Sequence, residues 1–172
     1  MDYGSVKDLR PRIDPSAVAM PTAVVTGDVT IGADVSVWHH AVVRGDMAPV
    51  SIGSMTNVQD GAVIHTNTGL PTTIGARVTI GHLAIVHAAT VEDDALVGMG
   101  AILLDGAIVG AGAMVAAGTV VPPRKVVPPG TLAIGNPMRI ARDLTEAERA
   151  ANRLNVEHYV ALAKASAPGG TR

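Results

Sequence analysis

An aliphatic side chain recurs at every sixth position through most of this 172-residue chain. The runs with this spacing are Ile13, Ala19, Val25, Ile31, Val37 and Val43; Ile52, Val58 and Ile64; Ile74, Ile80 and Val86; and Val91, Val97, Leu103, Val109, Val115 and Val121. A period of six fits neither a helix nor an ordinary strand. It is typical of a parallel β-helix, in which each hexad forms a short strand and a turn and three hexads form one triangular coil.

The composition indicates a narrow interior. Hydrophobic residues make up 48% of the chain, but aromatic residues only 2%, and there is no Phe. Ordinary cores fill volume with rings, so an interior of Val, Ile, Leu and Ala indicates a prism too narrow for them. A net charge of −2 gives no electrostatic reason to expect nucleic acid or a membrane surface as a partner. The lack of Cys excludes disulfides and thiolate metal sites.

The six-residue pattern breaks in three places. Residues 47–50 and 69–73 are insertions, and one residue is missing between Val86 and Val91. We expect loops at these breaks, where functional residues commonly lie. The first residues show no apolar segment of a signal peptide, and no apolar run is long enough to span a membrane, so we expect a cytoplasmic protein.

After Val121 the pattern ends in a Pro-rich segment, which predicts a turn or cap. The spacing of apolar residues then predicts a helix, and Thr145 and Glu148 form a capping box at its start. We therefore expect a β-helix domain over residues 1–142, a C-terminal helix over 143–167 packed on it, and a disordered tail over 168–172.

The repeat phase places two histidines on one face of the prism. His65 follows Ile64 directly, and His87 follows Val86 directly, three hexads later. The two side chains should therefore stack one strand spacing apart, at roughly 4.8 Å. Arg44 should stack beneath His65 by the same count.

His82 belongs to a different face, where it should stack on Asp60. In a single chain His82 cannot easily join His65 and His87. In a threefold trimer, a face of one prism meets a different face of its neighbour, so three imidazoles could converge at each interface. Three His ligands with one open position are typical of catalytic zinc sites.

Four stretches of the chain resemble the gamma-class carbonic anhydrases: residues 43–46, 56–65, 78–87 and 98–101. The similarity extends over roughly 13–143. It implies a left-handed parallel β-helix with a C-terminal helix, assembled as a homotrimer. The implied activity is that of a lyase, the zinc-dependent reversible hydration of CO₂ to bicarbonate at the trimer interfaces.

The resemblance also implies a metal-ligand set. His65 and His87 of one subunit and His82 of its neighbour would bind Zn²⁺, although three neutral imidazoles accept Co²⁺ or Fe²⁺ as well. Zinc lowers the pKa of a bound water to about 7, which supplies hydroxide at neutral pH.

Further roles follow from the same resemblance. Gln59 would orient the hydroxide, and Arg44 and Asp60 would form a catalytic salt-bridge network. Arg44 and Asp46 would also tie the subunits together. On the helix, aligning the helix ends places Tyr159 near the metal as a catalytic residue, with Asn155 one turn earlier as the alternative.

The chain departs from the family pattern after His65, and this departure leaves two other functions open. The segment 66–73 is short and has no carboxylate, whereas active relatives carry a proton-shuttling Glu there, so a low activity is one expectation. A metal-binding scaffold with little or no activity would also fit. A hexapeptide acyltransferase would instead use one His as a general base, without metal, and 135–137 resembles the end of such enzymes' β-helices.

Overall fold

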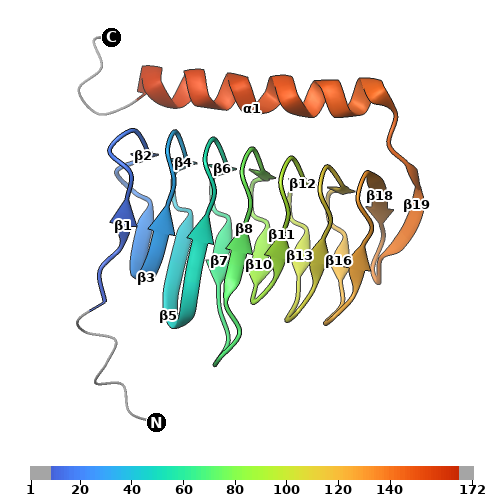
Figure 1. Ribbon diagram of the computed structural model, residues 1–172, viewed down its shortest axis with the longest axis horizontal. Helices are drawn as coiled ribbons and strands as arrows, with labels where there is room; N and C mark the ends of the chain where they lie inside the picture. Colours follow the sequence, from blue (N-terminus) through green and yellow to red (C-terminus); the bar gives the residue numbers. More distant parts are fainter. Residues whose placement is uncertain (1–8, 167–172) are drawn as a thin grey trace.

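The computed structural model describes residues 9–166, which form a parallel β-helix followed by one C-terminal helix (Figure 1). The predicted fold class, mainly β with hexapeptide coils and a C-terminal helix, is confirmed. The helix α1 (Glu146–Ser166) extends back along the length of the prism. The predicted disordered tail over 168–172 lies outside the described residues.

Two sheets wrap the prism. The 11-stranded sheet contains β1 (Arg12–Ile13), β3 (Val24–Ile31), β5 (Val42–Ile52), β7 (Val63–His65), β8 (Thr72–Ile74), β10 (Ile85–His87), β11 (Thr90–Val91), β13 (Ile102–Leu103), β14 (Ile108–Val109), β16 (Val120–Val121) and β17 (Val126–Val127). The 8-stranded sheet contains β2 (Val18–Ala19), β4 (Ser36–Val37), β6 (Asn57–Val58), β9 (Thr79–Ile80), β12 (Leu96–Val97), β15 (Met114–Val115), β18 (Thr131–Ile134) and β19 (Arg139–Asp143).

The larger sheet covers two faces of the prism. The long strands β3 and β5 pair along both faces, and from β5 one branch runs through β7, β10, β13 and β16. The other branch runs through β8, β11, β14 and β17, while the smaller sheet forms the third face. Pairing is parallel except between β18 and β19, where the chain turns back toward α1.

The interior holds the predicted aliphatic side chains. Ile64, Ile80 and Leu103 are fully buried in one continuous cluster. Within residues 9–166 the Trp and Tyr rings lie outside it: Trp38 packs with Met20, Ala163 and Tyr159 between the prism and α1. The edge of one ring faces the other, with the centroids of Trp38 and Tyr159 5.5 Å apart. Rings therefore fasten the helix and do not fill the coil.

Stacked turns approach each other so closely that certain positions require Gly. A Cβ atom at Gly98 would lie 2.6 Å from the backbone nitrogen of Ala117 in the next coil. At Gly81 it would lie 2.7 Å from the backbone nitrogen of Met99. The glycines that follow the buried aliphatic residues thus allow the coils to stack at strand spacing.

The three breaks in the repeat differ in structure. Residues 47–50, expected as a loop, lie within β5, where an expanded bulge opposes Asp28 before pairing resumes between Val29 and Val50. The expectation of a loop was wrong because the extra residues form a bulge inside β5, and pairing with β3 resumes directly after it. The second break forms the loop 66–71 between β7 and β8, closed by a bridge between Asn67 and Leu70. The third, 88–89, joins β10 to β11.

The predicted capping box is present at the start of α1. The Thr145 hydroxyl accepts from the Glu148 backbone N–H at 3.2 Å, and a Glu148 carboxylate oxygen accepts from the Thr145 N–H at 2.9 Å. Arg142 donates to both Glu148 oxygens at 2.8 Å. Arg142 first, and then Thr145, lower the pKa of Glu148 to about 2. The capping bonds and the contact with Arg142 together fix where α1 begins.

Candidate metal centre

His65 and His87 lie side by side on neighbouring strands of one face. They are register partners in the parallel pair β7–β10, and their ring centroids are 5.2 Å apart. The predicted stacking of these two histidines is confirmed. Arg44 ends up beneath them because Val43 on β5 pairs with Ile64 on β7.

Each of these two histidines is held by a carboxylate. His65 Nε2 lies 2.8 Å from Asp46 Oδ1, and the other Asp46 oxygen accepts from Arg44. His87 Nδ1 lies 2.6 Å from Asp105 Oδ1. Burial opposes ionisation of Asp46, but its hydrogen bonds to His65 and Arg44 outweigh burial and lower its pKa. The bulge in β5 is thus what carries a carboxylate to His65.

His82 lies on the third face, in the turn after β9. Its Nδ1 is 3.0 Å from Asp60 Oδ2, as the predicted stacking on Asp60 requires. Within residues 9–166 of one chain, no three or more His, Asp or Glu side chains are grouped so that they could hold a metal ion. One chain therefore supplies two histidines on one face and the third on another.

A cavity of about 300 Å³ lies beside His82, between β9, β12 and α1. Gln59 lines it and is buried; its Oε1 accepts from the His82 backbone N–H at 3.1 Å, and its Nε2 donates to Asn57 at 3.0 Å. Both helix residues considered in the sequence, Asn155 and Tyr159, also line this cavity. Gln59 and Tyr159 therefore belong to the surroundings of His82.

Two electrostatic features concern Tyr159 on the His82 side and Arg44 on the His65 side. Burial, and secondly the Asp60 carboxylate, raise the pKa of the Tyr159 hydroxyl, so it stays protonated. The predicted network of Arg44 with Asp60 is not formed within one chain: Arg44 pairs with Asp46, and Asp60 with His82. These two residues could meet only across subunits.

The three imidazole donors suit a metal ion that is neither strongly hard nor strongly soft. Each of the three imidazoles uses one ring nitrogen for an aspartate, and metal-binding histidines typically do so while the other nitrogen coordinates. The remaining nitrogens are Nδ1 of His65, Nε2 of His82 and Nε2 of His87. Nitrogen ligands without thiolate suit zinc, cobalt or iron.

Comparison with known proteins identifies the family. The model described as "Hexapeptide repeat of succinyl-transferase" matches residues 71–104 and 88–123. A probable carbonic anhydrase of Methanocaldococcus jannaschii is 46% identical over 142 residues, which are 83% of this chain and 89% of that protein. The mitochondrial gamma carbonic anhydrase 3 of Arabidopsis thaliana is 46% identical over 169 residues, 95% of this chain and 66% of that protein. The chain belongs to the gamma carbonic anhydrase family.

A solved structure agrees with the gamma carbonic anhydrase fold described above. The crystal structure of a hexapeptide transferase family protein from Anaplasma phagocytophilum superposes with a TM-score of 0.88 at 40% identity. The match covers 91% of this chain and 92% of that one, so it includes both the coils and the helix.

Two residues beside this gamma carbonic anhydrase site were not predicted from the sequence. Asp105 contacts His87, and the Asn67 amide donates to the other Asp105 oxygen at 2.7 Å. Asp105 comes two positions after Leu103, which pairs with Val86. Counting hexads from Val86 would have found it, but the missing residue after Val86 hides this register.

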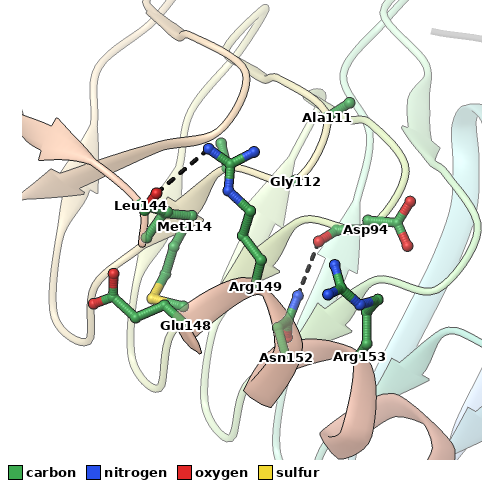
Figure 2. Close-up of a pocket in the computed structure, with 10 residues that line it drawn as sticks. Asp94, Ala111, Gly112, Met114, Leu144, Glu148, Arg149, Asn152 and Arg153 are labelled. Atoms are coloured by element: carbon green, nitrogen blue, oxygen red, sulfur yellow. Dashed lines mark hydrogen bonds between the residues drawn. The ribbon is translucent and has the colours of Figure 1, made fainter. Parts of the chain in front are cut away.

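A second hollow, of about 250 Å³, lies away from the histidines between the start of α1 and the turn at 111–112 (Figure 2). Within it Arg149 donates to the Leu144 carbonyl at 3.4 Å, and Asn152 donates to the Asp94 carbonyl at 2.8 Å. Most of its charges are already paired: Asp94 with Arg77, Glu148 with Arg142 and Arg153 with Glu146. In this gamma carbonic anhydrase family member, these contacts fasten the helix.

No helix within residues 9–166 is both long enough and apolar enough to cross a membrane. The helix α1 spans 21 residues, but only Val156 and Ala163 of it are buried. Most of its exposed side chains are polar, although Leu154 and Leu162 are also exposed.

Proposed function

We propose that this chain forms a homotrimer that reversibly hydrates CO₂ to bicarbonate on a zinc ion at each subunit interface. The ion would be held by His65 and His87 of one subunit and by His82 of the partner subunit. The observation that carries this proposal is the arrangement of three aspartate-held histidines on two faces of one chain. Family membership supports the reaction.

The surfaces around the histidines support association of two faces. Leu83 and Met99, next to His82, are 69% and 59% exposed, which is unusual for large apolar side chains flanking a polar site. Beside His87 lies a shallow hollow lined mostly by apolar side chains, among them Ile85, Ile102 and Pro123. Apolar side chains on the His82 side and an apolar hollow on the His87 side are complementary. A cyclic trimer would join them at each of its interfaces.

A bound zinc ion would supply hydroxide near neutral pH by lowering the pKa of a water ligand to about 7. The residues of the chain would do the rest. Gln59 is fixed by its bonds to His82 and Asn57, and the second Nε2 hydrogen would donate to a nucleophile beside His82. Leu96 and Met99 give the cavity apolar walls suited to CO₂.

Proton release would depend on what can accept the proton at the site. The loop 66–71 between β7 and β8 carries no carboxylate, so it lacks the acidic residue that would carry the proton away in the family pattern. Without that route, buffer would have to accept the proton directly at the site. We therefore propose that turnover depends strongly on buffer concentration and is low in weak buffer.

Subunit complementation tests the shared site. His82→Ala and His87→Ala trimers should each be inactive in stopped-flow CO₂ hydration after zinc loading. Unfolding and refolding them together at equal ratio should leave about one interface in four with all three histidines, and should restore activity in proportion. Mixed trimers that native mass spectrometry detects but that stay inactive would contradict the proposal. Asp34→Asn is the control, because Asp34 pairs with Lys164 of α1 and forms no contact with the three histidines.

The same samples separate the two other candidate functions. Zinc bound at one ion per chain, without CO₂ hydration above buffer, would leave a metal-binding scaffold. Binding of acetyl-CoA by metal-free trimer, with zinc having no effect, would favour an acyltransferase. Elemental analysis and the mass of the assembled oligomer decide first whether a zinc trimer exists. We also propose a cytoplasmic location, which cell fractionation tests.

A further inference from the structure

The contact between His87 and Asp105 is the shortest of the three histidine–carboxylate contacts. The distance is 2.6 Å, against 2.8 Å for His65 with Asp46 and 3.0 Å for His82 with Asp60. An ionised carboxylate can only accept hydrogen bonds, so the neutral His87 ring must carry its hydrogen on Nδ1. The lone pair of the ring is then on Nε2.

Asp105 is itself held by a side chain from another part of the fold. Asn67 donates its amide to Asp105 Oδ2 at 2.7 Å, and Asn67 Oδ1 accepts from the Thr68 backbone N–H at 2.8 Å. The second bond fixes which end of the amide is the donor. The Asn67 backbone is anchored too, by its bridge to Leu70. A chain of hydrogen bonds thus runs from the loop 66–71 through Asp105 to the His87 ring.

The surroundings distinguish Asp105 from Asp46. Asp46 also accepts from Arg44, so it has a role in an ion pair besides its contact with His65. Within residues 9–166, the ion-pair partner of Asp105 is His87, and no Lys or Arg lies within salt-bridge distance of it. Its two oxygens are used by a ring N–H and an amide N–H, which is an arrangement for orientation.

We propose that Asp105 is a positioning residue that holds His87 in the Nδ1–H form, and that Asn67 fixes Asp105 for this purpose. The consequence rests on the proposed function, because a metal ion would bind the Nε2 lone pair that this arrangement leaves free. The short loop 66–71, which lacks the family's acidic residue, then has a role of its own. It orients one ligand through Asn67.

The first measurement needs no metal. Long-range ¹H–¹⁵N correlation spectra of the metal-free trimer should show His87 in the Nδ1–H tautomer. Asp105→Ala should convert the ring into a mixture of tautomers. Asp105→Asn should favour the opposite, Nε2–H tautomer, because the fixed Asn67 donor holds the one remaining oxygen and the new amide NH₂ then faces His87 Nδ1. Circular dichroism confirms folding of each variant.

The second measurement is zinc affinity, from competition with a chromophoric chelator. Asp105→Ala should weaken zinc binding by about 10- to 100-fold, the usual effect of removing a residue that orients a ligand. Asp105→Asn should weaken it at least as much, because the Nε2 atom then carries the hydrogen, and Asn67→Ala should weaken it least of the three. The control is Asp34→Asn, since Asp34 pairs with Lys164 at the helix and touches no histidine.

Two results would overturn the proposal. One is an Asp105→Ala protein whose His87 stays in the Nδ1–H form. The other is a zinc affinity of that variant within about twofold of wild type. Failure of the wild-type trimer to bind zinc would contradict the proposed function instead, while the tautomer measurement on metal-free protein still decides the role of Asp105.

Discussion

The coils from 42 to 89 and those from 90 to 133 share one kind of interior but differ on the outside. Ile80 in the first group and Leu103 in the second are equally buried in the same cluster. The first group carries the three histidines, the bulge in β5 and the loop 66–71, whereas the second follows the six-residue pattern without interruption. Chemistry is thus added at outward positions and at breaks in the repeat, while the inward positions stay the same.

The largest expected effect comes from removing an outward side chain of the first group. His82→Ala should lower CO₂ hydration by on the order of 10³-fold or more, because the proposed metal would lose a ligand. Its effect on the unfolding free energy of metal-free protein should be smaller than that of a core truncation, since His82 lies outside the buried aliphatic cluster. Lys125→Ala in the second group is the control and should change neither stopped-flow rate nor denaturant midpoint.

Inward positions should behave alike in both groups. Ile80→Ala and Leu103→Ala should each lower the unfolding free energy by about 3 kcal/mol, since both side chains are fully buried and leave cavities. Urea denaturation at fixed protein concentration measures this. If the unfolding free energy lost at Ile80 is less than half that lost at Leu103, the histidine-bearing coils are packed more loosely. The two interiors would then not be equivalent.

A matched pair of glycines separates the effect of coil stacking on stability from its effect on zinc binding. Gly81→Ala and Gly98→Ala place Cβ at 2.7 and 2.6 Å from a backbone nitrogen of the next coil, so each should cost about 2 kcal/mol of stability. Only Gly81 precedes a predicted ligand, so only Gly81→Ala should also weaken zinc binding in chelator competition. Equal zinc affinity in the two variants would mean that the backbone position of Gly81 does not determine how His82 binds zinc.

The smallest effect concerns the end of α1 that lies over the second group. The pKa of Glu148 is lowered from 4.5 to about 2 in the folded chain, so its ionised form stabilises the fold above about pH 4.5. That stabilisation is lost as the pH falls from about 4.5 to about 2. Glu148→Gln should therefore flatten the acid dependence of the melting temperature in this range. An unchanged slope would indicate that the capping contacts with Arg142 and Thr145 contribute little in solution.

The period of six was sufficient to predict the coil and the alignment of His65 with His87, because parallel stacking converts sequence distance into position. The same count placed Asp60 beside His82. Asp105 was missed because its register has to be counted across the shortened hexad after Val86. The count could not show that residues 47–50 remain in a strand, since a bulge depends on how a strand pairs with its neighbour. The trimer and the roles of the site residues stay predictions.

The position of Trp38 has a practical consequence. It is the chain's one tryptophan, 8% exposed, and its ring lies against Tyr159 of the helix and outside the coil interior. Its fluorescence therefore reports whether the helix is docked, while the far-ultraviolet signal of the strands reports the coils. If the helix detaches first on heating, the two optical signals will have different midpoints, and the protein's own emission will time that event without an added label.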